Sequence, residues 1–237
     1  MINASVKKFL CAALLILLTS CAACAAYKTT PDELKRMSIF ISNFTEAGFF
    51  NFDLLTEFPE EEQNDSVGEY EEAKTHLGMP GNLTELVKFG IVHNLINNPK
   101  RIAKCTDRKC EAGNLKLDKK FVNESVKKYF DIDISKKDLS IVQDDPSAAF
   151  SFDGKFYHFG SDSFKDPDND TVYYADVQGV TQRGSHLMLA GELYNSKNKT
   201  DRPGMFAATV KRIKWQGKST WAVIDMTTDW VTNSGRD

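Results

Sequence analysis

The sequence of 237 residues has no apolar run long enough to cross a membrane. Its longest run, residues 9–18, makes a helix of about 15 Å at ~1.5 Å per residue, half of the ~30 Å that a bilayer core requires. The chain also lacks the Gly-x-Ser-x-Gly elbow, the His-Glu-x-x-His zinc motif and the glycine-rich patterns that bind nucleotide phosphates. We therefore assign no catalytic residue and no cofactor from the sequence, and favour a protein that is not an enzyme.

Histidine is scarce. The chain has four histidines, which are His76, His93, His158 and His186. No two of them have the sequence spacing of metal ligands, so only tertiary folding could bring them together. His93 falls inside an apolar helical stretch, where we predict a hydrogen-bonded structural histidine. The sequence accordingly assigns no metal site.

One stretch has alternating carboxylates, at Asp166, Asp168 and Asp170. Carboxylate oxygens suit a hard cation such as calcium, and an EF-hand loop places its first ligands at positions 1, 3 and 5. That loop also requires glycine at position 6 and glutamate at position 12, where this chain has Thr171 and Val177. An EF-hand is excluded. We interpret the stretch as a polar loop before a strand, with an irregular calcium loop as the alternative.

The chain also has no excess of positive charge. Its 33 acidic residues outnumber its 30 basic ones. Acidic residues gather in residues 57–72. A negative surface repels phosphate groups, which argues against a nucleic-acid partner and against charge-driven adhesion to anionic lipid. We interpret the acidic stretch as a long solvated loop, with a site for a cation or a basic partner as the alternative.

The N-terminus has a basic start, a short apolar run and small residues after it, which is the pattern of an export signal. The run closes in Leu18-Thr19-Ser20-Cys21, which resembles the lipobox of bacterial lipoprotein precursors. The resemblance implies that residues 1–20 are a signal peptide. It further implies that Cys21 becomes the N-terminus and carries a thioether-linked diacylglycerol and an amide-linked acyl chain such as palmitate.

The same resemblance implies where the protein resides. Removal of residues 1–20 takes away two lysines and leaves a net charge of −5. Residues 21–29 then form a tether that holds the folded domain close to a membrane of the bacterial cell envelope. Ala22 in place of Asp fits the periplasmic side of the outer membrane in a Gram-negative cell. The alternative is ordinary cleavage near Ala25 or Ala26, which leaves a soluble secreted protein.

Cys105 and Cys110 are separated by four residues with a turn-forming interior. We predict a structural disulfide between them, as an oxidising compartment favours, with a contribution of roughly 2 kcal/mol to stability. A zinc site needs two more ligands, and no His or Cys lies nearby in the sequence. A redox motif usually has two intervening residues. Cys24 is left as an odd thiol in the tether.

Helix signals dominate the first half of the domain. Thr30-Pro31-Asp32-Glu33 combines an N-cap, a proline at the first helical position and a capping glutamate, which predicts an amphipathic helix over residues 31–47. A second capping box at Asn82 opens a helix that reaches about residue 97. A hairpin around the two cysteines is predicted over residues 101–117, followed by a third helix over about residues 119–130.

After residue 131 the apolar pattern alternates. Asp153-Gly154 predicts a hairpin, and four longer strands follow with turns between them, which is typical of an antiparallel meander. We predict one α+β domain of residues 30–237, with amphipathic helices in residues 30–131 packed on a curled antiparallel sheet in residues 138–230. This order of elements resembles the NTF2-like and cystatin-like modules of exported lipoproteins.

Trp215 and Trp221 lie on neighbouring predicted strands, and the register decides how they are related. Pairing Trp215 with Trp221 places both on one face, whereas pairing it with Thr220 places them on opposite faces. A shared exposed face with Tyr173, Tyr194 or Trp230 could stack a sugar or a peptide. We favour core packing, because aromatic residues usually supply buried area.

These features predict a membrane-anchored lipoprotein of the cell envelope whose domain binds a ligand without catalysis. The expected partners are the membrane, through the lipid anchor, and an unidentified protein or small molecule. Nucleic acid is not expected. The alternative is an envelope hydrolase in which a carboxylate and His158 or His186 meet in the concave face of the sheet.

Overall fold

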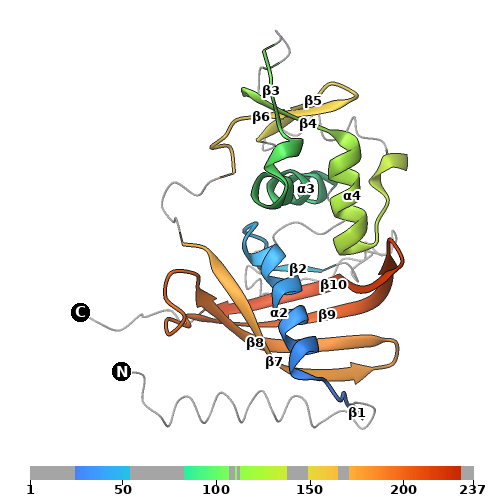
Figure 1. Ribbon diagram of the computed structural model, residues 1–237, viewed down its shortest axis with the longest axis vertical. Helices are drawn as coiled ribbons and strands as arrows, with labels where there is room; N and C mark the ends of the chain where they lie inside the picture. Colours follow the sequence, from blue (N-terminus) through green and yellow to red (C-terminus); the bar gives the residue numbers. More distant parts are fainter. Residues whose placement is uncertain are drawn as a thin grey trace, which may run out of the picture.

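The computed structural model describes residues 25–53, 83–106, 110, 113–137, 149–164 and 171–230. Within them, three α-helices and two antiparallel sheets form an α+β fold, which confirms the predicted fold class (Figure 1). Among these residues, no helix combines the length and apolar character needed to cross a membrane. Several predicted features lie outside the described residues: Cys21, Cys24, the acidic residues 57–72, and Asp166, Asp168 and Asp170.

Helix α2 (Pro31–Thr45) begins where the capping signal predicts. The Thr30 Oγ1 atom accepts a hydrogen bond from the Glu33 N–H at 3.2 Å, and Pro31 occupies the first turn. The apolar stripe of the helix is buried, with Met37, Phe40, Ile41 and Phe44 each at most 6% exposed. Figure 1 shows α2 lying across one face of the larger sheet.

Three hydroxyl groups of α2 form hydrogen bonds with the first half of strand β7 (Tyr173–Arg183). Ser42 Oγ accepts a hydrogen bond from the Ala175 N–H at 3.0 Å, and Ser38 Oγ accepts one from the Val177 N–H at 2.9 Å. Thr45 Oγ1 donates to the Tyr173 carbonyl at 2.6 Å. The helix therefore supplies hydrogen-bond partners for the backbone groups of β7 along the edge that does not pair with β8.

Helices α3 (Leu83–Asn97) and α4 (Lys119–Phe130) pack closely against each other. A Cβ atom at Gly90 would lie 2.6 Å from Val122 Cγ1, so only glycine permits this approach. The predicted structural role of His93 is confirmed. Its Nδ1 atom lies 3.2 Å from Ser125 Oγ and its Nε2 atom 3.1 Å from the Tyr129 hydroxyl, and its side chain is buried between the helices.

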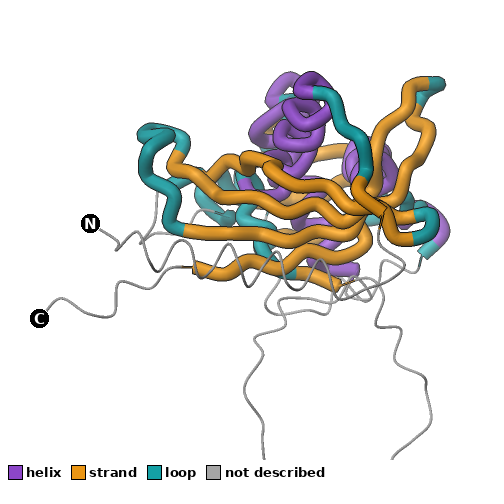
Figure 2. The backbone as a smooth tube through the Cα atoms, turned by 90° about the horizontal axis from the view of Figure 1, so that it is seen from below, coloured by secondary structure: helices purple, strands orange, loops and turns teal. Residues whose placement is uncertain are grey.

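The larger sheet has the strand order β1-β7-β8-β9-β10-β2. Its members besides β7 are β1 (Ala25–Ala26), β2 (Phe52–Asp53), β8 (His186–Asn195), β9 (Gly204–Trp215) and β10 (Lys218–Trp230). Bulges between Val177 and Gly179 and between Val223 and Asp225 bend the sheet. In Figure 2 the helices lie on one side of these strands.

The register of β9 and β10 places the two tryptophans on opposite faces. Trp215 pairs with Lys218 and Trp221 pairs with Arg212, so the tight turn at Gln216 and Gly217 sets the parity. Trp221 is 5% exposed and its ring lies 5.8 Å from that of Phe40 in the core. Core packing is therefore confirmed for Trp221, and the two tryptophans do not share a face.

The second sheet corrects the expectation of a single meander. Its order is β3 (Ala103–Lys104), β4 (Leu115–Asp118), β6 (Phe156–Phe159) and β5 (Phe150–Phe152). The predicted hairpins β3–β4 and β5–β6 both form, but they pair with each other through β4 and β6. The β5–β6 hairpin thus joins a strand from the helical half of the chain, because β4 offers the matching apolar alternation of Leu115 and Leu117.

Candidate functional site around strand β6

Strand β6 carries two consecutive polar side chains that are both buried. Tyr157 is 0% exposed and His158 is 2% exposed. Successive side chains on a strand point to opposite faces, and the two residues accordingly have different surroundings. Tyr157 lines a pocket at the start of α4, whereas His158 contacts the disulfide of Cys105.

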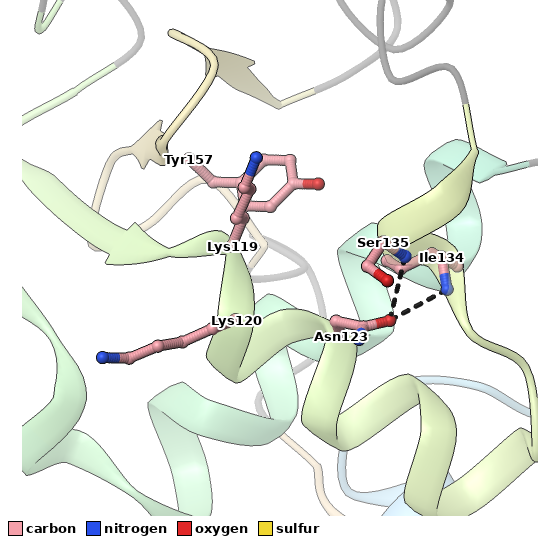
Figure 3. A pocket seen from close by; sticks show the side chains of 6 residues that line it. All are labelled: Lys119, Lys120, Asn123, Ile134, Ser135 and Tyr157. Atoms are coloured by element: carbon pink, nitrogen blue, oxygen red, sulfur yellow. Dashed lines mark hydrogen bonds between the residues drawn. The ribbon is translucent and has the colours of Figure 1, made fainter.

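The pocket has a volume of about 170 Å³. It is lined by residues from the first turn of α4, from the short 3₁₀ helix η2 (Ile134–Lys136) and from β6, namely Lys119, Lys120, Asn123, Ile134, Ser135 and Tyr157 (Figure 3). A cavity of ~150 Å³ admits a molecule as large as benzene. The pocket therefore fits a small ligand of a few heavy atoms.

The hydroxyl of Tyr157 has no hydrogen-bond partner in the part of the chain that the structure describes. In Figure 3 it points from β6 toward the side of the pocket that Ile134 and Ser135 form. Burial raises the pKa of Tyr157 above its ordinary value, so the group stays a neutral donor. The ring is held in place by Phe152, which stacks on it with centroids 4.6 Å apart.

An unpaired donor of this kind is unfavourable by about 1–3 kcal/mol. The other buried polar side-chain atom without a partner among the described residues is Trp221 Nε1, which lies in the core and does not line the pocket at α4. Tyr157 is therefore the buried donor that a ligand in the pocket can reach.

The pocket is electropositive. Lys119 and Lys120 come from the first turn of α4, where the helix dipole adds partial positive charge, and none of the six lining residues is acidic. Lys120 Nζ lies 4.0 Å from Asp118 Oδ2 and points away from Tyr157 in Figure 3, so Lys119 is the lysine that adds charge beside the tyrosine. Asn123 Oδ1 accepts hydrogen bonds from the Ile134 and Ser135 N–H groups at 2.8 and 3.2 Å, which fixes η2 beside the helix.

Two carboxylates lie near the pocket, and both are engaged. Asp118 caps α4 by accepting from the Lys120 N–H at 2.9 Å. Asp133 accepts a hydrogen bond from the Ser135 hydroxyl and pairs with Lys127 Nζ at 3.1 Å, and these bonds hold its pKa well below the ordinary value. Neither carboxylate therefore supplies an acceptor to Tyr157.

On the opposite face of β6, His158 joins a disulfide to a carboxylate. The bond between Cys105 and Cys110 is present, with their Cα atoms 6.0 Å apart. His158 Nδ1 lies 3.2 Å from Cys105 Sγ, and His158 Nε2 lies 3.0 Å from Asp153 Oδ2. Cys105 is 8% exposed, so the contact with the imidazole is shielded from water.

Asp153 sits in the β5–β6 turn and is held there by backbone groups. Its Oδ1 atom accepts from the Phe156 N–H at 2.7 Å and from the Lys155 N–H at 2.9 Å. Burial raises the pKa of Asp153, but these bonds and the one to His158 outweigh it and lower the pKa to about 2. An ionised carboxylate can only accept, so Nε2 donates in this contact, and Nδ1 is the ring nitrogen that faces the sulfur.

The sequence predicted the cysteine pair but missed its partner. His158 is 53 residues from Cys105, and the pairing of Lys116 with His158 and with Ala103 brings it close. No local signal indicates this contact. His186 begins β8 in the other sheet, and His76 lies outside the described residues.

The arrangement expected for a hydrolase forms only in part. A carboxylate and His158 do meet, but in the smaller sheet and not in the concave face of the larger one. The imidazole faces a disulfide sulfur, which cannot act as a nucleophile while the bond is intact.

The predicted aromatic surface is divided between separate places. Tyr173 and Trp230 pack with centroids 4.9 Å apart at the edge of the core. Tyr194 pairs with Tyr174 at 5.9 Å. The alternation of β7 places Tyr174 on the face opposite to Tyr173, so the described aromatic residues do not form one stacking surface.

No protein-family model, curated protein or solved structure matches the chain. The resemblances to lipoprotein precursors and to NTF2-like or cystatin-like modules remain predictions from the sequence.

Proposed function

We propose that this chain is a lipid-anchored protein of the bacterial cell envelope whose domain binds a small anionic molecule in the pocket at the start of α4. The observation that carries the binding proposal is the Tyr157 hydroxyl, which is buried, unpaired and directed into a pocket. The anchoring proposal is supported by Leu18-Thr19-Ser20-Cys21 alone.

The chemistry of the lining selects the ligand. Tyr157 offers a neutral O–H donor, and Lys119 offers positive charge beside the N-terminal end of a 12-residue helix. A group that accepts a hydrogen bond and carries negative charge satisfies all of these at once. A small carboxylate or phosphate compound of a size that fits about 170 Å³ is the ligand class that this supports.

Binding is better supported than hydrolysis. The pocket has a donor and cations but no acidic or imidazole side chain among its lining residues that could transfer a proton. The carboxylate–imidazole pair of Asp153 and His158 faces the sulfur of Cys105 instead. The pocket and the carboxylate–imidazole pair, which a hydrolase would need together, therefore lie on opposite faces of β6.

Calorimetric titration of the full chain in detergent tests the proposal, with inorganic phosphate and a series of short carboxylates as probes. We expect at least one probe to bind with a 1:1 stoichiometry. Tyr157→Phe removes only the hydroxyl and should weaken binding by about tenfold, the effect of one buried hydrogen bond of ~1.4 kcal/mol. Lys119→Gln should weaken it as well.

The matched controls are Tyr174→Phe and Lys214→Gln, which change the same groups in the larger sheet. Both should bind the probe as the unaltered chain does. Equal affinities for the Tyr157→Phe variant and the unaltered chain would show that the hydroxyl does not contact the ligand.

A further inference from the structure

We propose that reduction of the disulfide between Cys105 and Cys110 converts this cluster into a three-ligand site for zinc. The proposal is independent of the anion pocket, because His158 and Tyr157 leave β6 on opposite faces. It rests on the positions of three ligand atoms and of the carboxylate behind them.

The ligand atoms are already close together. Cys105 Sγ, Cys110 Sγ and a ring nitrogen of His158 all lie within 4.8 Å of one another. A tetrahedral zinc ion with Zn–S near 2.3 Å and Zn–N near 2.0 Å places its ligand atoms about 3.6–3.8 Å apart. Once the S–S bond is broken, the sulfurs need only to separate by about 2 Å to reach this spacing.

Asp153 supplies the support that a metal-binding histidine requires. A ligating imidazole commonly donates its second N–H to a carboxylate, which fixes the tautomer and the ring orientation. Here Asp153 Oδ2 accepts from His158 Nε2 at 3.0 Å, so Nδ1 is the atom left for a metal. The other oxygen of Asp153 is fixed by the backbone N–H groups of Lys155 and Phe156.

The His158 side chain is 2% exposed, so an ion bound to it would be largely shielded from solvent. No fourth His, Cys, Asp or Glu ligand belongs to this group in the described chain. Three protein ligands leave one position of the zinc ion open for water or another small ligand.

The reduction is a two-electron step for which a dithiol is the reductant. Its thiolate attacks Cys110 Sγ, which is more exposed than Cys105, and the S–S bond breaks with Cys105 Sγ leaving as a thiolate beside His158. The second thiol of the reductant then attacks the mixed disulfide, forms the reductant's own disulfide and releases Cys110 Sγ. Zinc binds both sulfurs as thiolates, so the protons that the two thiols hold are released to solvent.

Cobalt(II) is the probe, because a tetrahedral thiolate complex of cobalt has an intense visible spectrum and a charge-transfer band. The experiment uses the full chain with Cys11, Cys21 and Cys24 replaced by serine, which leaves Cys105 and Cys110 as its thiols. The protein is reduced with dithiothreitol, freed of reductant without oxygen, and titrated with cobalt and then with zinc.

We expect one cobalt ion per reduced chain, displaced by zinc, and no thiolate band for the oxidised chain. Cys110→Ser and His158→Asn should each abolish the tetrahedral spectrum. Asp153→Asn should retain the spectrum and lower the affinity about 10–100-fold, as outer carboxylates do at other metal sites. His186→Asn is the matched control and should bind as the reduced chain does.

Circular dichroism of each variant separates a lost ligand from a lost fold. Two results would overturn the proposal: a reduced, folded chain that gives no thiolate-to-cobalt band, or a folded His158→Asn variant that binds cobalt with unchanged spectrum and affinity. Neither result bears on anion binding by Tyr157, so the two proposals fail separately.

Discussion

Tyr157 and His158 are neighbours in the chain, yet each serves a different site. The Tyr157 hydroxyl is an unpaired donor in an electropositive pocket, and the His158 imidazole bridges Cys105 and Asp153. The pleat of one strand therefore separates two sites by the thickness of a single sheet. A change at either residue can be tested without altering the chemistry of the other.

The buried imidazole of His93 predicts a loss of stability in acid. Burial, with Lys128 and Arg101 nearby, lowers its pKa from 6.5 to about 4 in the folded protein. The unfolded chain therefore binds a proton at higher pH than the folded one. The contribution of neutral His93 to the free energy of unfolding is fully present above pH 6.5. It falls by roughly 3 kcal/mol as the pH drops to about 4. Denaturant unfolding at several pH values measures this.

His93→Gln is the comparison, because glutamine has donor and acceptor groups but does not titrate in this range. The difference in unfolding free energy between the two proteins should shrink as the pH falls from 6.5 to 4. His186→Gln, in the β7–β8 hairpin, is the control. A difference that stays constant with pH would contradict the assignment of a neutral, buried His93.

The contact of α3 with α4 predicts an unusual effect of alanine at Gly90. Alanine is a better helix former than glycine by about 1 kcal/mol, but its Cβ would lie 2.6 Å from Val122 Cγ1 and 3.0 Å from the Val122 carbonyl. We expect Gly90→Ala to destabilise the protein by about 1–3 kcal/mol in thermal or denaturant unfolding.

Val122→Ala in the same chain should recover part of that loss, since it removes the clashing methyl group. Gly179→Ala, at a position with nothing within 4 Å of the added Cβ, is the control. If Gly90→Ala is as stable as the unaltered chain, the helices are not packed as closely as described.

The hydroxyl contacts between α2 and β7 predict the result of removing one of them. Ser42→Ala deletes the acceptor of the Ala175 N–H and leaves that buried group unpaired. The free energy of unfolding should fall by about 1–2 kcal/mol. Ser219→Ala, at an exposed position on β10, should change it by less than about 0.5 kcal/mol. Equal effects of the two substitutions would show that the contact with β7 contributes nothing.

The proposed lipid anchor predicts a simple result for Cys21→Ala in a bacterial host. Acyl chains contribute about 0.8 kcal/mol for each buried methylene, so the unaltered protein should sediment with membranes and incorporate labelled palmitate. The variant should lose both properties. Lipidation at this residue would be excluded if the variant still sediments with membranes and the unaltered protein has the mass of the unmodified chain.

The sequence predicted the local elements well because their signals are local. Thr30 and Pro31 mark the start of α2, and Asp153-Gly154 marks the β5–β6 turn, as the structure confirms. Pairing between distant strands left no such signal. The partnership of β4 with β6, and through it the contact of Cys105 with His158, depends on residues far apart in the chain.

The pocket at the start of α4 was not predictable for a related reason. Tyr157 looked like one aromatic residue of a strand, and only the packing of β6 against α4 and η2 leaves its hydroxyl without a partner. The parity of Trp215 and Trp221 likewise depended on a turn whose length the sequence left open.

The most direct test of anion binding compares the unfolding free energy of the unaltered chain and Tyr157→Phe, each with and without the bound anion. Without anion, we expect the variant to be more stable by about 1 kcal/mol, because it no longer buries an unpaired donor. At about 100 times the dissociation constant of the unaltered chain, the anion should stabilise that chain by ~2.7 kcal/mol and the variant clearly less. A variant that is less stable without anion, and gains as much from it, would contradict the proposal.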